Sequence, residues 1–445
     1  MPKPLKWVLR GFGGLLLGLV LLVLAWGLSN SPLADSAPRP RPAELEVHVR
    51  DIPAERNGFF IQIGLLAPSG EDPAVAGQRL WIAQHYAPGS GGLALPAGDL
   101  WDCDKGNEEC TGLWFRRSSD MAHELAVHAE FVRRCVMLAD APDYEERLIP
   151  WGDGTHLELP QYKTVMACNR VLRASLVLAA GRGQSAAALQ AFDRADRLAR
   201  LQLTGCHSLI GQAIAWAAAR RNAQTAAALA AQHPELASAL LARLPPLPPE
   251  VLSAAPWIAF ESGFGQATID GMEAGCRRAI ARKQFDAAAD RLWCEYRIGL
   301  LPNATKQALD QQWLAIRAVA DRGMPAALQA DASLPDLVPP WAYLHWRNSI
   351  GGVLVDVARP QYAQYLAKQA DVELLRTAAA LALRMSVEHV DAARRQTWLD
   401  AQSLPAPLRA RLSLDAGALS VKPWLADVPG AAAGPSPQIR LPLAS

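Results

Sequence analysis

The most distinctive hydrophobic pattern in the chain is an uninterrupted apolar run near its start. Residues Gly11 to Leu28 carry no charge. A helix of this length rises about 27 Å, close to the roughly 30 Å hydrocarbon thickness of a bilayer. Trp7 and Trp26 lie near the two ends of the run, where indole rings favour the membrane–water interface. The run therefore predicts a transmembrane helix over 11–28 that contacts the lipid bilayer.

The charges that flank this run predict its direction across the membrane. Lys3, Lys6 and Arg10 precede it, whereas the first cations after it are Arg39 and Arg41. Because positive charge favours the cytoplasmic side, residues 1–10 are expected in the cytoplasm and the bulk of the chain outside it. We expect a single-pass protein of a bacterial inner membrane with a periplasmic domain.

Two features of the apolar run leave alternatives open. Small residues such as Ala25 and Gly27 could serve a signal peptidase, but the run is longer than the usual apolar core of a cleaved signal, which favours an anchor. Gly14 and Gly18 form a small-xxx-small pair, the pattern that brings two membrane helices together in a homodimer. Glycine is also frequent in membrane helices that do not pair.

The segment that follows the apolar run changes composition twice. Residues 29–42 (SNSPLADSAPRPRP) are rich in proline and predict an extended tether that holds the domain away from the bilayer. Residues 43–117 show mixed patterns. The apolar stretch Phe59 to Leu66 fits either a buried strand or part of a short helix, because periodicity cannot separate the two at this length.

From Ser118 onward, apolar residues recur at steps of three and four, which predicts helices. The first helical pattern ends near Ala139, and the second ends at Gly181-Arg182-Gly183, since glycine favours the left-handed conformation after a helix. A third ends at Gly205. Short turns between such helices make antiparallel neighbours. The expected fold class is mainly α: a helical-hairpin bundle or an irregular α-solenoid after the membrane helix and the small mixed region.

Proline-rich breaks suggest where the helical part divides. The clearest is Leu244 to Pro249 (LPPLPP). It separates one predicted helical subdomain over 118–244 from a second over 250–427. Residues 428–445 are dominated by Ala, Gly, Pro and Ser at their start, and we expect a disordered tail there.

Two cysteines in a loop predict a disulfide and a compartment. Cys103 and Cys110 flank Gly106-Asn107, which can turn the chain so that the sulfurs meet. Closing so short a loop stabilises the fold by about 2.5 kcal/mol in the chain-entropy model. Such a bond persists in an oxidising compartment.

The remaining cysteines are less clear from sequence. One continuous helix would hold Cys276 and Cys294 roughly 27 Å apart, whereas a turn near 282–286 would let them bond, and the turn is favoured. Cys135, Cys168 and Cys206 fall on helical faces and are expected to be small core residues.

Composition and motifs exclude several classes of function. The chain has 445 residues, 51% of them hydrophobic, and a net charge of +1, so no electrostatic footprint for nucleic acid exists. Neither a G-x-S-x-G nor a phosphate-binding loop occurs. We therefore expect no cofactor, no metal site and no recognised catalytic residue. Glu261, beside Gly263 and Gly265, is the one candidate cleft residue; its alternative is a surface or capping role.

Aromatic residues gather in one later region. They are Trp341, Tyr343, Trp346, Tyr362 and Tyr365. Amphipathic rings can bind a peptide or a glycan, but they more often close a hydrophobic core.

Several short motifs carry a resemblance to one group of proteins. The motifs are Asn57-Gly58-Phe59-Phe60 with Gly64, Asp72-Pro73 with Gly77, the Cys103/Cys110 loop, Pro302-Asn303-Ala304-Thr305, and Asn348 with Gly351 ahead of Pro360-Gln361-Tyr362. Together they resemble the uncharacterised proteobacterial single-pass membrane proteins with a helical periplasmic domain. That group has no assigned activity, so the resemblance implies a location and a fold and transfers no site residue.

The sequence therefore favours a non-enzymatic envelope protein that serves as an interaction, scaffold or assembly module for an envelope protein partner. The alternative is an anchored envelope hydrolase with an unfamiliar site near Glu261. That alternative predicts a polar pocket containing a carboxyl group with a perturbed pKa.

Overall fold

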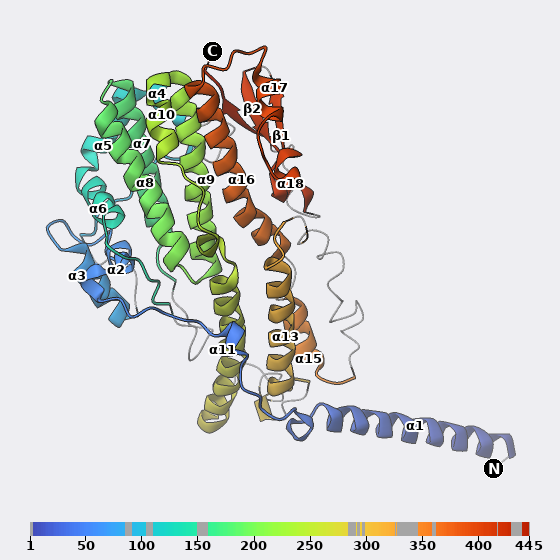
Figure 1. The fold of residues 1–445 in the computed structure, drawn as a ribbon. Helices are drawn as coiled ribbons and strands as arrows, with labels where there is room; N and C mark the ends of the chain where they lie inside the picture. The colour runs from blue at the N-terminus through green and yellow to red at the C-terminus, as the bar shows by residue number, and fades with distance from the viewer. Residues whose placement is uncertain are drawn as a thin grey trace.

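The structure, a computed structural model, is mainly helical and has one small sheet, which confirms the expected fold class. It describes residues 3–84, 91–103, 110–148, 159–283, 291, 294–295, 299–324, 326, 346–357, 362–415, 417–428 and 438–444, with side chains from residue 11 onward. Figure 1 shows long helices side by side, with the first helix projecting away from them.

The projecting helix is α1, Lys3–Ser29. Its stretch Gly11–Ser29 has a mean hydropathy of 2.2 and no buried residues. Among the described residues this is the one helix long and apolar enough to cross a membrane. Nothing lies within 4 Å of the positions where side chains would start at Gly14 and Gly18. That surface is open, and pairing with a second copy stays a prediction.

The predicted free tether is wrong, because the proline-rich segment lies against the domain. The Asp35 carboxylate accepts hydrogen bonds from the backbone N–H groups of Asn303 and Ala304, each at 3.0 Å. These residues begin α13, Pro302–Ala320, so a negative charge from the tether caps a helix N-terminus. Arg41 Nη2 donates to the carbonyl of Ala259 at 2.7 Å. Composition alone could not reveal these two contacts, since both partners are more than 200 residues away in the sequence.

The predicted mixed region 43–117 contains, where it is described, irregular segments that join short helices. They are η2 Ala43–Leu45, η3 Ala54–Arg56, α2 Gly58–Ile63, α3 Pro73–Ile82 and α4 Cys110–Arg116. The apolar run after Asn57 is therefore a helix, and the strand alternative is excluded. Helices α2 and α3 cross so closely that a Cβ at Gly64 would lie 1.9 Å from the carbonyl oxygen of Pro73. Only glycine permits that approach.

The main bundle is formed by helices that pack side by side (Figure 1). They are α5 Ser118–Val127, α6 Ala129–Ala139, α7 Lys163–Gly181, α8 Ser185–Gly205, α9 Leu209–Gln232, α10 Ala237–Ala242 and α16 Tyr362–Val387. Helix α7 ends as predicted, with Gly183 at a φ of 70°. Alanine-rich faces on α8 and α9 let neighbouring helices approach closely.

The proposed division at 244 does not separate two cores. Helix α16 packs along α9, and one hydrophobic cluster runs from Phe59 to Leu443. A buried ion pair also crosses the boundary, because Arg376 Nη1 lies 2.7 Å from Asp196 Oδ1 and both side chains are almost fully buried. Proline breaks mark an extended segment here, which lies across the bundle without ending a domain.

At the end of the bundle nearest α1, a second set of helices continues the domain (Figure 1). They are α11 Ala255–Arg282, α13 and α15 Ser349–Val357. The 3-10 turn η7 Pro249–Leu252 precedes α11 and η1 Pro32–Ala34 follows α1, whereas η6 Pro234–Leu236 contacts α9 and α10. A second hydrophobic cluster joins α9, α11, α13 and the start of α16.

The C-terminal region carries the sheet. Its elements are α17 Arg395–Asp400, α18 Ala406–Arg409, β1 Leu412–Asp415, β2 Ala418–Val421, η9 Trp424–Asp427 and β3 Ile439–Pro442. The strands are antiparallel in the order β1-β2-β3, with Leu419 opposite Leu441. The tail predicted to be disordered thus contains a strand. Leu441 is buried in the core, and this pairing compensates the entropy cost of ordering the segment.

Three disulfides join parts of the chain. Cys103 is bonded to Cys110, and Cys276 to Cys294 with a Cα–Cα distance of 4.9 Å. Helix α11 ends at Arg282, and Lys283 adopts a left-handed φ of 56°. The helix therefore does not continue from Cys276 to Cys294, in agreement with the turn predicted near 282–286. The prediction that Cys135 and Cys168 are plain core residues is wrong, since they form a third bond between α6 and α7. Cys206 is free and buried.

The Cys103–Cys110 and Cys135–Cys168 bonds close loops of different length, which predicts how much each bond stabilises the fold. Cys135–Cys168 spans 33 residues and Cys103–Cys110 spans 7. In the chain-entropy model, replacing the first pair by alanine lowers the free energy of unfolding by about 3.7 kcal/mol and replacing the second by about 2.5 kcal/mol. Urea denaturation of the oxidised full-length protein measures both. A larger loss from the short loop would contradict the prediction.

Candidate functional site

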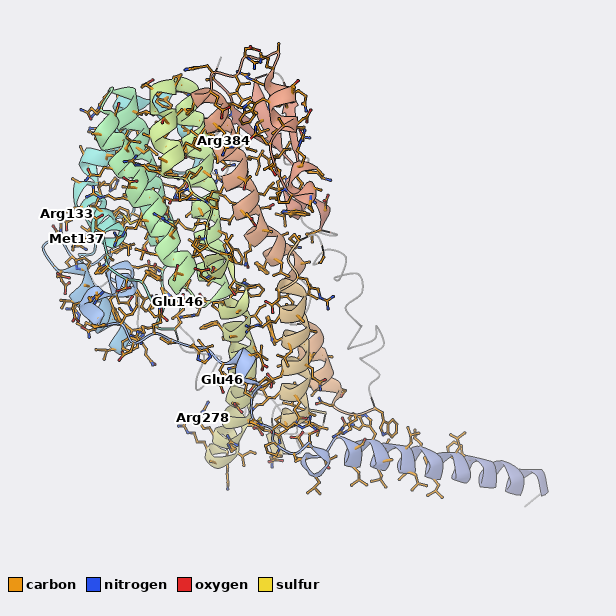
Figure 2. The ribbon with its side chains drawn as sticks, in the orientation of Figure 1. Glu46, Arg133, Met137, Glu146, Arg278 and Arg384 are labelled. Carbon is orange, nitrogen blue, oxygen red and sulfur yellow. A yellow bond between two sulfur atoms is a disulfide. The ribbon has the colours of Figure 1, made fainter. Side chains whose placement is uncertain are left out.

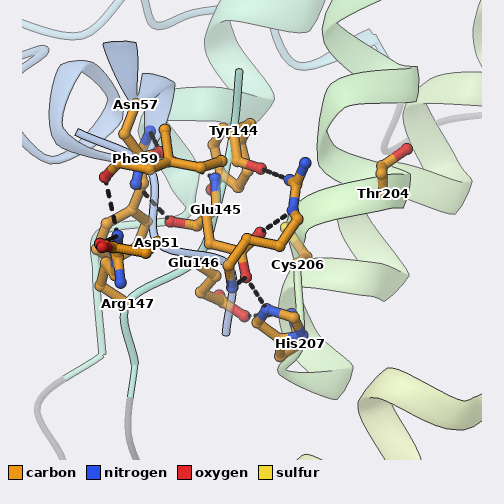
Figure 3. Close-up of polar contacts among 12 residues, drawn as sticks. Asp51, Asn57, Phe59, Tyr144, Glu145, Glu146, Arg147, Thr204, Cys206 and His207 are labelled. Carbon is orange, nitrogen blue, oxygen red and sulfur yellow. Dashed lines mark hydrogen bonds and ion pairs between the residues drawn. The ribbon is translucent and has the colours of Figure 1, made fainter. Parts of the chain in front are cut away.

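Two adjacent carboxylates, Glu145 and Glu146, are fully buried where the N-terminal segment meets the turn between α8 and α9 (Figure 3). Asn57 positions the pair through the backbone. Its side chain donates to the Glu145 carbonyl at 2.9 Å and accepts from the Glu145 N–H at 2.8 Å. Sequence reasoning missed this cluster, because its members come from four separate stretches and no local motif marks them.

Glu145 is held by one cation and one histidine. Its carboxylate accepts from the Arg50 side chain at 2.7 Å, from the Arg50 N–H at 2.9 Å, and contacts His207 Nε2 at 2.6 Å. Burial by itself raises the pKa of Glu145, but the hydrogen bonds with His207 and Arg50 outweigh it and leave the pKa below its ordinary value. Glu145 is therefore ionised at neutral pH.

Glu146 is held by four hydrogen-bond donors, three from the turn before α9 and one from Tyr162 at the start of α7. The backbone N–H groups of His207 and Ser208 donate to one carboxylate oxygen at 2.8 and 2.6 Å. The hydroxyls of Tyr162 and Ser208 donate to the other at 2.6 and 2.8 Å. Ser208 is also the N-cap of α9, so the carboxylate lies at a helix N-terminus, where negative charge is favoured.

The turn that supplies these donors requires a glycine. A Cβ at Gly205 would lie 1.9 Å from the carbonyl oxygen of Tyr144, and the Gly205 carbonyl accepts from the Glu146 N–H at 2.8 Å. Burial raises the pKa values of Tyr144, Tyr162 and Cys206 well above their ordinary range, so these groups stay neutral. The polar groups of the cluster satisfy one another, which is the pattern of a structural joint.

Glu261, the candidate from sequence, lies on α11 beside this joint. Its carboxylate accepts from the Leu209 N–H at 3.1 Å. Burial raises the pKa of Glu261 to about 7, and the nearby negative charge of Glu146 adds to the effect. A carboxyl with a pKa near 7 has the property expected of a general acid. However, Glu261 lines neither of the two pockets described below, and its contact with Leu209 is a helix cap.

The aromatic region divides between core and surface. Tyr362 packs against Trp313 with ring centroids 4.5 Å apart and against Trp257 at 6.4 Å. Tyr365 lies under the Lys368 ammonium group. Trp346 is 45% exposed. Trp341 and Tyr343 lie outside the described residues.

A groove along α16 consists of two adjoining pockets. The first has a volume of about 650 Å³ and the second about 630 Å³, and both are lined by Glu373, Pro405 and Leu408. One wall is the proline-rich segment with η7, and the other is α18 with the segment before it. We call this pair of pockets the α16 groove.

The first pocket of the α16 groove is acidic. Glu250, Asp321 and Glu373 line it, and none of the described residues that line it is basic. Glu250 and Glu373 are exposed, and neither side-chain carboxylate has a hydrogen bond or ion pair with a described residue. Its apolar lining includes Met324 and Leu366. Such a surface favours a ligand that combines positive charge with apolar groups.

The second pocket contains Arg376 and Arg384 as well as Glu373. Arg384 donates to Gln402 at 3.1 Å and lies at the end of the bundle remote from α1 (Figure 2). Arg376 is engaged by Asp196 and by the Pro245 carbonyl. Among the described lining residues of the α16 groove, the basic side chains are thus confined to the second pocket.

Comparisons with known proteins place no function on these features. No family model matches the chain, and neither a curated protein nor a solved structure does. Within the described part of the chain, no group of three or more metal-ligating side chains is close enough to hold an ion.

Glu261 makes stability depend on pH in a defined direction. Its folded pKa of about 7 lies above the ordinary value of 4.5, so the folded state holds a proton that the unfolded state has released. The free energy of unfolding therefore falls as pH rises from about 4.5 to about 7. In Glu261→Gln this loss is absent, so denaturation at about pH 5 and about pH 8 should show a shallower decline than in the parent.

Glu235→Gln is the matched control for this measurement, because Glu235 is exposed and follows the C-terminal end of α9, whereas the joint lies at its N-terminal end. It should keep the parental pH dependence. Equal slopes for Glu261→Gln and the parent would contradict the raised pKa of Glu261. The effect is separable from that of Glu145, whose lowered pKa costs stability only as pH falls through its folded value.

Proposed function

We propose that this chain is a single-pass, membrane-anchored envelope protein whose periplasmic helical domain binds a partner and has no catalytic role. The observation that carries the proposal is an exposed apolar helix, α1, joined to a disulfide-bonded domain that has an open groove with carboxylates that pair with no described residue. The resemblance to proteobacterial single-pass proteins agrees with this location.

The anchor is supported by the energetics of α1. Leaving a run of leucine and valine side chains in water is unfavourable by about 25 cal/mol for each square ångström of apolar surface. No residue of Gly11–Ser29 is buried by the domain, so a bilayer is the environment that removes this cost. The three disulfides are consistent with an oxidising space around the domain.

The partner is inferred from the α16 groove. We propose an extended peptide segment that places a lysine or arginine beside Glu250 and Glu373 and apolar side chains against Met324 and Leu366. Exposed carboxylates without a partner are the groups most available to an incoming cation, and the proline-rich wall offers few backbone donors.

The location is tested by reporter fusions after Ser445. Alkaline phosphatase folds only where disulfides form, so this fusion should be active, and a fusion to green fluorescent protein exported by the same route should be dark. The full-length protein should also remain in membranes after alkaline extraction. A bright fluorescent fusion or a freely soluble protein would overturn the proposed location.

The ligand class is tested by peptide binding to the full-length protein in detergent. A short labelled peptide of alternating lysine and leucine should bind more tightly than the same peptide with glutamate for lysine. Glu373→Gln should weaken binding of the lysine peptide by about two- to fivefold, since an exposed ion pair contributes about 0.5–1 kcal/mol. The control, Glu55→Gln, should bind like the parent. Equal affinity for both peptides would contradict a cation-selective groove.

A further inference from the structure

The end of α1 is bonded to the surface that carries an exposed tryptophan. Asn30 is fully buried directly after α1. Its side chain donates to the Trp346 carbonyl at 2.5 Å and accepts from the Asn348 N–H at 2.7 Å. The Asn30 carbonyl also accepts from the Gly299 N–H at 3.3 Å. These three bonds fix the last turn of α1 against the domain, so Trp346 cannot move away from it.

Two more exposed groups share this edge. Leu33, in η1, is 94% exposed, which is unusual for a leucine in an otherwise well-packed domain. Arg347 is exposed and donates to the carbonyl of Ala34 at 2.6 Å. The edge therefore presents an indole, an isobutyl group and a guanidinium on segments that are hydrogen-bonded to, or directly follow, the end of α1. We call Leu33, Trp346 and Arg347 the membrane-proximal edge.

From this placement we infer that the membrane-proximal edge is a second lipid-binding site, inserted into the headgroup layer of the bilayer that α1 spans. This inference rests on the proposed transmembrane role of α1. Gly11–Ser29 has 19 residues, enough to cross the hydrocarbon, so Asn30 lies at its boundary. The headgroup layer extends about 5–7 Å beyond that boundary. A group hydrogen-bonded to Asn30 lies inside this layer.

The chemistry of each residue fits that depth. Indole rings are enriched at membrane interfaces because one edge is polar and the rest apolar. Leu33 adds apolar surface that lipid chains can cover, and a guanidinium can pair with the phosphate of a lipid headgroup. The consequence is a domain held at two points, by α1 and by its own edge, instead of swinging on a flexible tether.

The test places a probe at Leu33 in the full-length protein. The native cysteines do not interfere, because six are in disulfides and Cys206 is buried. Leu33→Cys, labelled with an environment-sensitive fluorophore and reconstituted into vesicles of phosphatidylcholine and phosphatidylglycerol, should emit at shorter wavelength and be quenched by lipids brominated in the upper acyl chain. Val127→Cys is the control, since Val127 is 61% exposed on α5, away from α1.

Further variants assign the effect to the edge. Trp346→Ala should reduce the quenching of the Leu33 probe, whereas Ile82→Ala, an exposed apolar residue on α3, should not. If the protein resists alkaline extraction but the Leu33 probe behaves like the Val127 probe, the inference is overturned while the anchor stands. If the protein is extracted, the anchor itself fails. An unchanged signal in Trp346→Ala would remove Trp346 from the site.

Discussion

The burial of Glu146 without a neighbouring cation is the constraint on which the arrangement of the domain depends. Removing a carboxylate from water costs several kcal/mol, so all four donors from His207, Ser208 and Tyr162 must be in place together. Those donors lie on the α8–α9 turn and just before α7, and Glu145 beside it is tied to Asn57. The hydrogen-bonded Glu146 carboxylate and its neighbour Glu145 thus hold three segments in a single geometry. These are the segment around Asn57, the start of α7 and the turn between α8 and α9.

What the sequence could predict follows from the range of each interaction. Some features depend only on neighbours in the chain. They are the ends of α7 and α8 at Gly181 and Gly205, the apolar α1 and the Cys103/Cys110 pair. Contacts between segments that are far apart in the sequence could not be predicted from it. Periodicity shows that a helix has a buried face but not which helix covers it, so neither the Cys135–Cys168 bond nor the cap that Asp35 gives α13 could be inferred. Strand β3 is four residues long, too short for alternation to stand out.

The motifs behind the resemblance acquire a physical meaning in the structure. Asn57 caps α2 and holds Glu145, Asp72 caps α3, and Gly64 allows α2 and α3 to cross. Asn303, at the start of α13, donates its backbone N–H to Asp35 of the proline-rich segment. Each of these residues solves a problem of packing or capping, and none lines the α16 groove. In this chain the motifs therefore meet requirements of the fold.

The distribution of satisfied and unsatisfied polar groups separates structure from function in this molecule. In the joint around Glu146, each buried carboxylate oxygen already has its donors, and a substrate would have to displace bonds that hold the fold. Glu261 is in a similar position, since its one described hydrogen bond caps α9 and burial raises its pKa to about 7. Glu250 and Glu373 differ because they are exposed, charged and without a described partner. Coulombic attraction is therefore free to act on a new ligand in this groove, which is why the α16 groove, and not the buried cluster, carries the functional argument.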